Sequence, residues 1–183
     1  MTRSDHASGT DRVAEIAAGL DVDIVVNIQG DLPLLDPEVP DALVEALRAD
    51  PTASITTPAV AITSAEELAD SSTVKVVCSP TGDALYFSRA AIPYDRDHPG
   101  AFGQARHHIG IYAYRRETLL HLASLQPSRL EGIEKLEQLR ALENGIPIRI
   151  VPVDGAPLEV DTERDLERAR AECRKPGHGQ RQA

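Results

Sequence analysis

The chain has 183 residues, of which 42% are hydrophobic and 26% charged, and this length and composition are typical of one globular domain. Its formal net charge of −10 argues against a protein whose main function is to bind nucleic acid, because such proteins usually present a basic face. Cys78 and Cys173 form neither a metal-ligand pattern nor a disulfide framework, and no apolar run approaches the roughly 20 residues that span a membrane. We therefore expect a soluble, cytoplasmic protein with reduced thiols and no membrane partner.

Apolar runs of strand length alternate with helical patterns along most of the chain. A first helix is predicted over 11–20, where apolar residues recur at the spacing of one helix face. A continuous β-branched run over 23–29 is typical of a strand that is covered on both faces. The next predicted elements are a helix over 37–49, a β-rich strand over 54–62 and a short helix over 64–69.

A hairpin pattern follows the short helix. Two short apolar runs, 74–78 and 84–87, flank Pro80-Thr81-Gly82-Asp83, which predicts an antiparallel pair of strands. Residues 92–104 are rich in Pro, Gly, Asp and His and predict a loop. The remaining predicted elements are a strand over 108–114, helices over 116–124 and 130–144, a strand over 147–153 and a closing helix over 162–172.

This alternation of strands and helices, without a second composition regime, predicts an α/β fold in a single domain. We expect a mostly parallel, Rossmann-like mixed sheet with helices on both faces and an antiparallel portion formed by the hairpin. The domain is expected to cover residues 1–172, and residues 173–183 are expected to form a disordered polar tail. In such sheets ligands bind at the carboxyl ends of the strands, so residues that directly follow strands are the first candidates for a site.

Two carboxylates meet that criterion. Asp31 directly follows the 24–28 strand, and Asp161 immediately precedes the Thr162 N-cap of the closing helix. Together they could hold Mg²⁺, a hard cation that takes oxygen ligands and substrate phosphates. From spacing alone, each is better explained as a turn residue or as an extra charge at a helix N-terminus.

Several motifs occur along the chain in a fixed order. The most specific is Asn27-Ile28-Gln29-Gly30-Asp31-Leu32-Pro33. The others are Met1-Thr2, His6-Ala7-Ser8-Gly9-Thr10-Asp11-Arg12, Val74-Lys75-Val76-Val77, Ala84-Leu85-Tyr86-Phe87-Ser88-Arg89-Ala90, Ile92-Pro93-Tyr94-Asp95-Arg96-Asp97, His108-Ile109-Gly110-Ile111-Tyr112, Leu130-Glu131, Leu136-Glu137-Gln138-Leu139-Arg140, Val160-Asp161-Thr162 and Asp165-Leu166-Glu167. As an ordered set they resemble the CMP-Kdo synthetases, also called 3-deoxy-manno-octulosonate (Kdo) cytidylyltransferases, whose signature is Gln-Gly-Asp-Glu-Pro.

The resemblance implies an Mg²⁺-dependent reaction, CTP + Kdo → CMP-Kdo + pyrophosphate, which serves lipopolysaccharide biosynthesis. By resemblance, Asp31 and Asp161 are the catalytic metal carboxylates, and the anomeric hydroxyl of the sugar attacks the α-phosphate. Catalysis of this kind depends on positioning and charge neutralisation and needs no covalent intermediate. The resemblance also implies a homodimer, with CTP and Kdo as small-molecule partners.

The resemblance further implies two sets of binding residues. The cytidine-contacting stretch comprises Ser8, Gly9, Thr10 and Arg12. The sugar-contacting residues are Gln29, Arg89, Arg96, His108, Tyr112, Glu137 and Gln138. Ordinary explanations remain open for several of them: helix capping for Ser8 and Thr10, solvation for the arginines, a structural role for His108, and an ion pair for Glu137. A guanidinium would suit the carboxylate of the sugar acid, and Arg96, in the irregular loop, is the better candidate.

The sequence departs from the family pattern in three places. The family begins with a strand and a loop rich in Arg, Ser, Gly and Lys that binds the CTP triphosphate, and the chain is therefore expected to be an N-terminally truncated member. Leu32 replaces the glutamate of the signature, and residues 155–159 differ from the Gly-rich approach to Val-Asp-Thr. These differences leave two alternatives open: a cytidylyltransferase for a related acid sugar, such as amino-Kdo or a sialic acid, and a catalytically inactive fragment.

Overall fold

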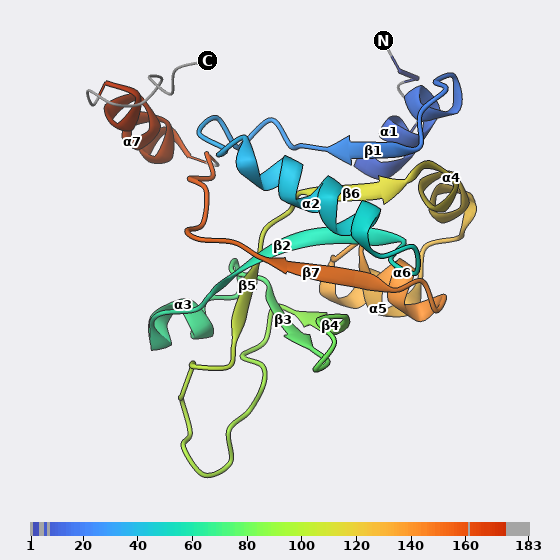
Figure 1. Cartoon of the computed structure of the whole chain (residues 1–183). Coiled ribbons are helices and arrows are strands. Elements are labelled where there is room, and N and C mark those ends of the chain that lie inside the picture. The colour runs from blue at the N-terminus through green and yellow to red at the C-terminus, as the bar shows by residue number, and fades with distance from the viewer. Residues whose placement is uncertain (1, 4–5, 7, 161, 175–183) are drawn as a thin grey trace.

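A computed structural model describes residues 2–3, 6, 8–160 and 162–174 (Figure 1). Its helices are α1 (Gly9–Ala18), α2 (Glu38–Ala49), α3 (Ala65–Ala69), α4 (Arg116–Ser124), α5 (Arg129–Glu134), α6 (Leu139–Glu143) and α7 (Glu163–Cys173). Its strands are β1 (Ile24–Asn27), β2 (Ile55–Ala61), β3 (Lys75–Cys78), β4 (Ala84–Ser88), β5 (Arg106–His108), β6 (Tyr112–Arg115) and β7 (Ile148–Pro152). Asp161 and residues 175–183, most of the predicted tail, lie outside the described residues.

The strands form one sheet in the order β1-β6-β2-β5-β3-β4, and β7 pairs with β2 beside this path. The prediction of an α/β fold is confirmed, but the prediction that the sheet is mostly parallel is wrong, since only β2–β7 is parallel among the six described pairings. β1 and β2 are joined through a helix and run in the same direction, as predicted. However, β6 lies between them, antiparallel to both, so they are not neighbours. β1 is the last described strand at its end of the sheet.

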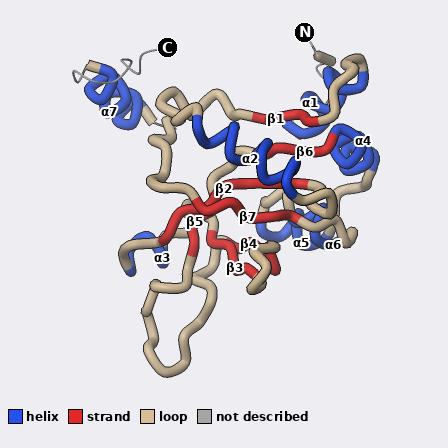
Figure 2. The backbone as a smooth tube through the Cα atoms, in the orientation of Figure 1, coloured by secondary structure: helices blue, strands red, loops and turns tan. Residues whose placement is uncertain are grey.

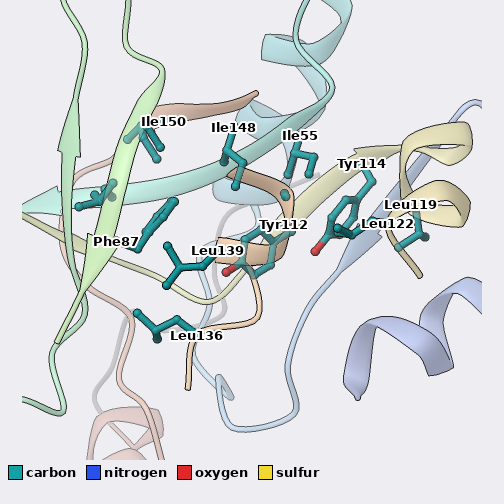
Figure 3. Packing of buried hydrophobic residues seen from close by; sticks show 14 of the residues in the cluster. Ile55, Phe87, Tyr112, Tyr114, Leu119, Leu122, Leu136, Leu139, Ile148 and Ile150 are labelled. Atoms are coloured by element: carbon teal, nitrogen blue, oxygen red, sulfur yellow. The ribbon is translucent and has the colours of Figure 1, made fainter. Parts of the chain in front are cut away.

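Helices cover both faces of the sheet, as predicted (Figures 1 and 2). On one face Leu43 and Leu47 of α2 pack against Ile111 and Ala113. The larger core lies on the other face, where α1, α4 and α6 contribute apolar side chains (Figure 3). Successive residues of β6 alternate between these cores, because side chains of a strand point to opposite faces in turn. In the described part of the chain, no helix combines the length and the apolar character required to cross a membrane.

The strand predicted over 108–114 is divided into β5 and β6 by an irregular segment. Four steps along β2, from Ile55 to Ala59, correspond to six steps from Tyr114 back to His108. The segment thus holds two more residues than β2 over the same stretch, which is a special β-bulge, larger than the usual one-residue insertion. The bulge brings the ring centroids of His108 and Tyr112 to 5.5 Å, whereas four residues of a regular strand span about 13 Å.

Two residues of β2 explain the bulge. Pro58 has no N–H to donate to a ladder, and its carbonyl accepts from Ile109 N–H at 3.0 Å. The Thr57 hydroxyl lies 3.1 Å from the Ile109 carbonyl and 2.7 Å from the Ile111 carbonyl, so it supplies a hydrogen-bond donor to the displaced backbone. The fully buried Ile109 and Ile111 then fix the segment in the α2 core.

The helix predicted over 130–144 is also interrupted. α5 ends at Glu134, its C-cap Lys135 has the left-handed conformation φ 56°, ψ 45°, and α6 begins only at Leu139. Helical spacing across this region predicts that Glu137 lies on the same side as Ile133, but the Ile133 side chain is 65% exposed. The reversal at Lys135 turns residues 136–138 inward by a different route.

Lys75 of β3 is fully buried and fixes the 70–73 loop to the end of β4. Its Nζ donates to the carbonyls of Asp70 at 2.6 Å, Thr73 at 2.6 Å and Arg89 at 2.7 Å. Burial lowers the pKa of this ammonium, and the nearby Asp70 carboxylate opposes the effect.

Lys75→Met is expected to lower the free energy of unfolding by about 2–3 kcal/mol, because three carbonyls lose a charged donor at once. Urea unfolding checks this. Arg106 of the neighbouring strand β5 is half-buried and forms no ion pair with a described residue, so Arg106→Met is the matched control. A Lys75→Met protein as stable as this control would contradict the claim that the three hydrogen bonds of Lys75 stabilise the fold.

Candidate functional site

A cavity of about 470 Å³ opens between the end of β1, the bulge after β5 and the turn between α5 and α6. The sequence-predicted residues that line it are Gly9, Thr10, Gln29, Asp31, His108, Tyr112, Glu137 and Gln138. They come from segments more than a hundred residues apart, so the fold gathers most of the predicted site at one place. Gly110 also lines the cavity, and an added Cβ there would lie 3.7 Å from Gln29 Nε2.

Asp31 provides a carboxylate at the carboxyl end of β1. Its Oδ1 atom is buried and has no hydrogen-bond partner among the described residues. Its backbone carbonyl accepts from Val160 N–H at 2.9 Å, so the chain segment that precedes the closing helix lies directly against it. Glu159 of the same segment lines the cavity. Asp161, the second predicted carboxylate, lies outside the described residues.

His108 is buried between Phe87 and Tyr112 and reaches the cavity. Its Nε2 lies 2.9 Å from the Thr57 hydroxyl. Because that hydroxyl donates its only proton to a bulge carbonyl, Nε2–H donates to the hydroxyl and Nδ1 is the ring's acceptor. Burial, with a smaller contribution from His107, lowers the pKa of His108 to about 3.

This pKa makes the stability of the fold depend on pH. Below the ordinary value of 6.5, the unfolded chain binds a proton at His108 while the folded chain does not, so stability falls as the pH decreases from 6.5 toward 3. In His108→Gln this slope is expected to be smaller by about 1.4 kcal/mol per pH unit. Urea unfolding between pH 4 and pH 7 measures it, with the exposed His121→Gln as control. An unchanged slope in His108→Gln would contradict the buried neutral state.

The turn between α5 and α6 contributes a carboxylate and an amide. Glu137 Oε1 is buried without a hydrogen-bond partner among the described residues, and Gln138 is 8% exposed. Tyr112 is buried beside them, and burial raises the pKa of its phenol well above the ordinary value, with Tyr114 and Glu137 adding to the effect. The cavity therefore presents unpaired acceptors and a neutral hydroxyl.

Four predicted residues do not line this cavity. Ser8 is the N-cap of α1 and accepts from Asp11 N–H, which is the capping alternative. Arg12 lies 3.5 Å from the Thr2 hydroxyl. The Arg89 guanidinium donates to the carbonyls of Glu134 at 2.9 Å and of Ser71 at 3.0 Å, and Arg96 is exposed in the loop between β4 and β5.

Comparison with known proteins decides the family. Residues 1–150 match the cytidylyltransferase family. The chain is 48% identical to a 3-deoxy-manno-octulosonate cytidylyltransferase of Syntrophotalea carbinolica, over 95% of this chain and 72% of that protein. It is 52% identical to the corresponding protein of Acidobacterium capsulatum, over 91% of this chain and 66% of that protein. The chain belongs to the cytidylyltransferase family.

Solved structures agree with this assignment. A CMP:2-keto-3-deoxy-manno-octonic acid synthetase complexed with CTP superposes with a TM-score of 0.88 at 44% identity, over 94% of this chain and 70% of that one. A 4-diphosphocytidyl-2C-methyl-D-erythritol synthase of Anaerococcus prevotii, at 13% identity and a TM-score of 0.57, shares the fold. The predicted family and the nucleotidyltransferase class are thereby confirmed.

Sequence reasoning missed several residues of this cytidylyltransferase cavity. Asn27 and Leu32 flank predicted residues on the same segment, so the strand-end rule could have included them. The other lining residues come from strands β5 and β6, from helix α4 and from loops, and only the fold brings them together: Ser72, Val74, His107, Tyr114, Leu122, Lys135, Leu136 and Glu159. His107 Nδ1 lies 3.3 Å from Glu67 Oε1, and burial lowers the pKa of this histidine.

Proposed function

We propose that the protein transfers CMP from CTP to the anomeric hydroxyl of Kdo, releasing pyrophosphate. The observation that supports this best is the cavity in which Gln29, Asp31, His108, Tyr112 and Glu137 meet, each at the expected place in its motif. The relatives bear the name of this reaction, and the solved neighbour was complexed with CTP. The chain spans 66–72% of the length of the first relatives it matches. Because it covers only part of these relatives, their activity is stated for this chain as a proposal.

Mg²⁺ is part of this proposal. The buried, unpartnered Oδ1 of Asp31 fits a cation, and Asp161, which directly follows the Val160 that bonds Asp31, is the proposed second ligand. Within the described ranges there is no group of three or more His, Cys, Asp or Glu that could hold a metal ion. This agrees with Mg²⁺, which keeps several waters and needs only one or two protein carboxylates beside substrate phosphates. When bound, the ion would offset negative charge at the reacting phosphate.

The sugar side of the cavity offers hydrogen-bond partners for hydroxyl groups. Glu137 Oε1 is an acceptor that no described residue uses, the His108 ring lines the same cavity, and the neutral Tyr112 hydroxyl can donate. A polyhydroxylated ligand would satisfy the buried acceptor of Glu137, whose desolvation is otherwise unfavourable. We include Gln29 and Gln138 in the sugar site because both line the same cavity.

The nucleotide side is proposed at the start of α1. Gly9 and Thr10 line the cavity there, at a helix N-terminus whose free N–H groups favour anions. Ser8 and Arg12 precede and follow them and are proposed as part of the cytidine-contacting stretch. A cytoplasmic location and a homodimer complete the proposal.

Pyrophosphate release tests the proposed function. The purified protein is incubated with CTP, Mg²⁺ and one sugar acid at a time: Kdo, amino-Kdo or a sialic acid. Release with Kdo above the other acids is the expected result, with CMP-Kdo as the second product. Turnover with a sialic acid alone would overturn the choice of Kdo. Absence of CTP binding in isothermal titration would overturn the enzyme function altogether.

A further inference from the structure

One basic side chain at the cavity is left without a role by the proposed site. Lys135 lines the cavity and is exposed, which places it at the opening. No hydrogen bond or ion pair joins its ammonium to any described residue. The carboxylate of the neighbouring Glu134 is directed elsewhere, since it accepts from the Ser88 hydroxyl at 2.6 Å and from Arg89 N–H at 3.0 Å.

The charges around the cavity require such a cation if the sugar is an acid. Asp31, Glu137 and Glu159 line the cavity, and the carboxylate of a sugar acid would add another negative charge. Both lining histidines have lowered pKa values because they are buried. Among the described lining residues, Lys135 is therefore the one permanent cation, since no arginine lines the cavity.

The two arginines predicted to meet the sugar carboxylate are placed elsewhere. Both Nε and Nη1 of Arg89 already donate to backbone carbonyls, of Glu134 and Ser71. Arg96 is exposed in the loop between β4 and β5 and does not line the cavity. Neither arginine therefore lies in the cavity, and Lys135 is the basic side chain that does.

The backbone conformation of Lys135 gives a second reason to assign this residue a function at the cavity. Its left-handed conformation is one that Gly or Asn adopts at lower cost than a lysine. A strained residue at a site often serves function, and here the same conformation turns Leu136, Glu137 and Gln138 into the cavity. The turn explains why the backbone is left-handed at this position, but it does not explain why the residue is a lysine.

We propose that the Lys135 ammonium binds the carboxylate of the sugar acid and so selects acid sugars over neutral ones. This inference rests on the proposed function and names the residue that sets its substrate class. It assigns Lys135 to substrate binding, with no bond made or broken at the side chain.

The test combines two variants with two ligands. Lys135→Asn keeps a residue that tolerates the left-handed conformation and removes the charge, and Lys135→Arg keeps the charge. Isothermal titration measures the Kd of Kdo and of its uncharged methyl ester, in the presence of Mg²⁺ and a non-hydrolysable CTP analogue. The matched control is Arg129→Gln, which removes an exposed positive charge from the first turn of the same helix.

Lys135→Asn is expected to weaken Kdo binding about 10- to 100-fold, as for the loss of a hydrogen bond to a charged group, and to leave ester binding within about twofold. Lys135→Arg and Arg129→Gln are expected to bind both ligands like the wild type. Equal losses for acid and ester, or no loss for the acid, would overturn the inference while leaving the proposed function intact. So would selective loss of acid binding in Arg96→Gln instead. A wild-type protein that binds no sugar acid would overturn both proposals.

Discussion

Asp31→Asn is expected to lower the rate of CMP-Kdo formation by about a thousandfold, because a metal ligand stabilises transition-state charge by several kcal/mol. The same change is expected to leave the fold as stable as the wild type, or more stable. The reason is that Oδ1 of Asp31 is buried without a hydrogen-bond partner among the described residues. An unpaired buried acceptor is unfavourable in the free protein and is tolerated where function needs it.

Initial rates of pyrophosphate release and urea unfolding measure the two effects on the same preparations. Asp21 is exposed on the loop before β1, and Asp21→Asn is the control for removal of one negative charge. Retention of a tenth or more of the wild-type rate by Asp31→Asn would contradict its role as a metal ligand. A large loss of stability in Asp31→Asn would contradict the claim that Oδ1 is buried without a hydrogen-bond partner.

Arg140→Met is expected to destabilise the fold by about 3 kcal/mol, the largest effect on stability among these predictions. Arg140 and Glu131 form a buried pair, with side chains only 5% and 14% exposed. Arg140 donates to the two carboxylate oxygens of Glu131, from Nε at 2.9 Å and from Nη2 at 2.5 Å. Removing the arginine leaves a carboxylate charge with little access to water, and Glu131 also caps Ser128 N–H at 2.8 Å.

A double-mutant cycle separates the pair from its parts. Because the cost arises from the charge left behind, Arg140→Met combined with Glu131→Gln is expected to be more stable than Arg140→Met alone. Arg129→Met, at an exposed position of α5, is the control for loss of an arginine. Additive losses in the double variant would show that the two residues act independently. The pair joins α5 to α6, so Arg140→Met should also weaken ligand binding at Glu137.

Local signals in the sequence account for much of the fold. The capping box Thr162–Asp165 begins α7 where it was predicted, and Ser8–Asp11 begins α1 two residues before the predicted start, because these side chains satisfy helix N–H groups within one turn. The β3–β4 hairpin follows from its turn, in which Gly82 has φ +87°. Each of these features is determined by residues that are close together in the chain.

The features that shape the cavity depend on distant contacts instead. The bulge between β5 and β6 exists because Thr57 and Pro58 lie opposite it on another strand. The break at Lys135 occurs inside a segment with unbroken helical spacing, and neither Gly nor Pro marks it. The spacing of apolar residues within one segment cannot predict a bulge or a helix break that contacts with distant segments cause. The ordered motifs indicated Asp31, Glu137 and His108 only because a resemblance contains tertiary information that spacing lacks.

The position of β1 at the end of the described sheet bears on how the site opens. Asp31 and Gln29 follow a strand that pairs with β6 alone among the described strands, and every residue of β1 is only half-buried. A strand bonded along one edge separates from its sheet at a lower free energy than a central strand does. Only molecules in which β1 is paired with β6 would then be able to bind. The apparent affinity for any ligand would scale with the fraction of molecules in this paired state. A decrease in the rate of amide hydrogen exchange in β1 when ligand is added would report this equilibrium directly.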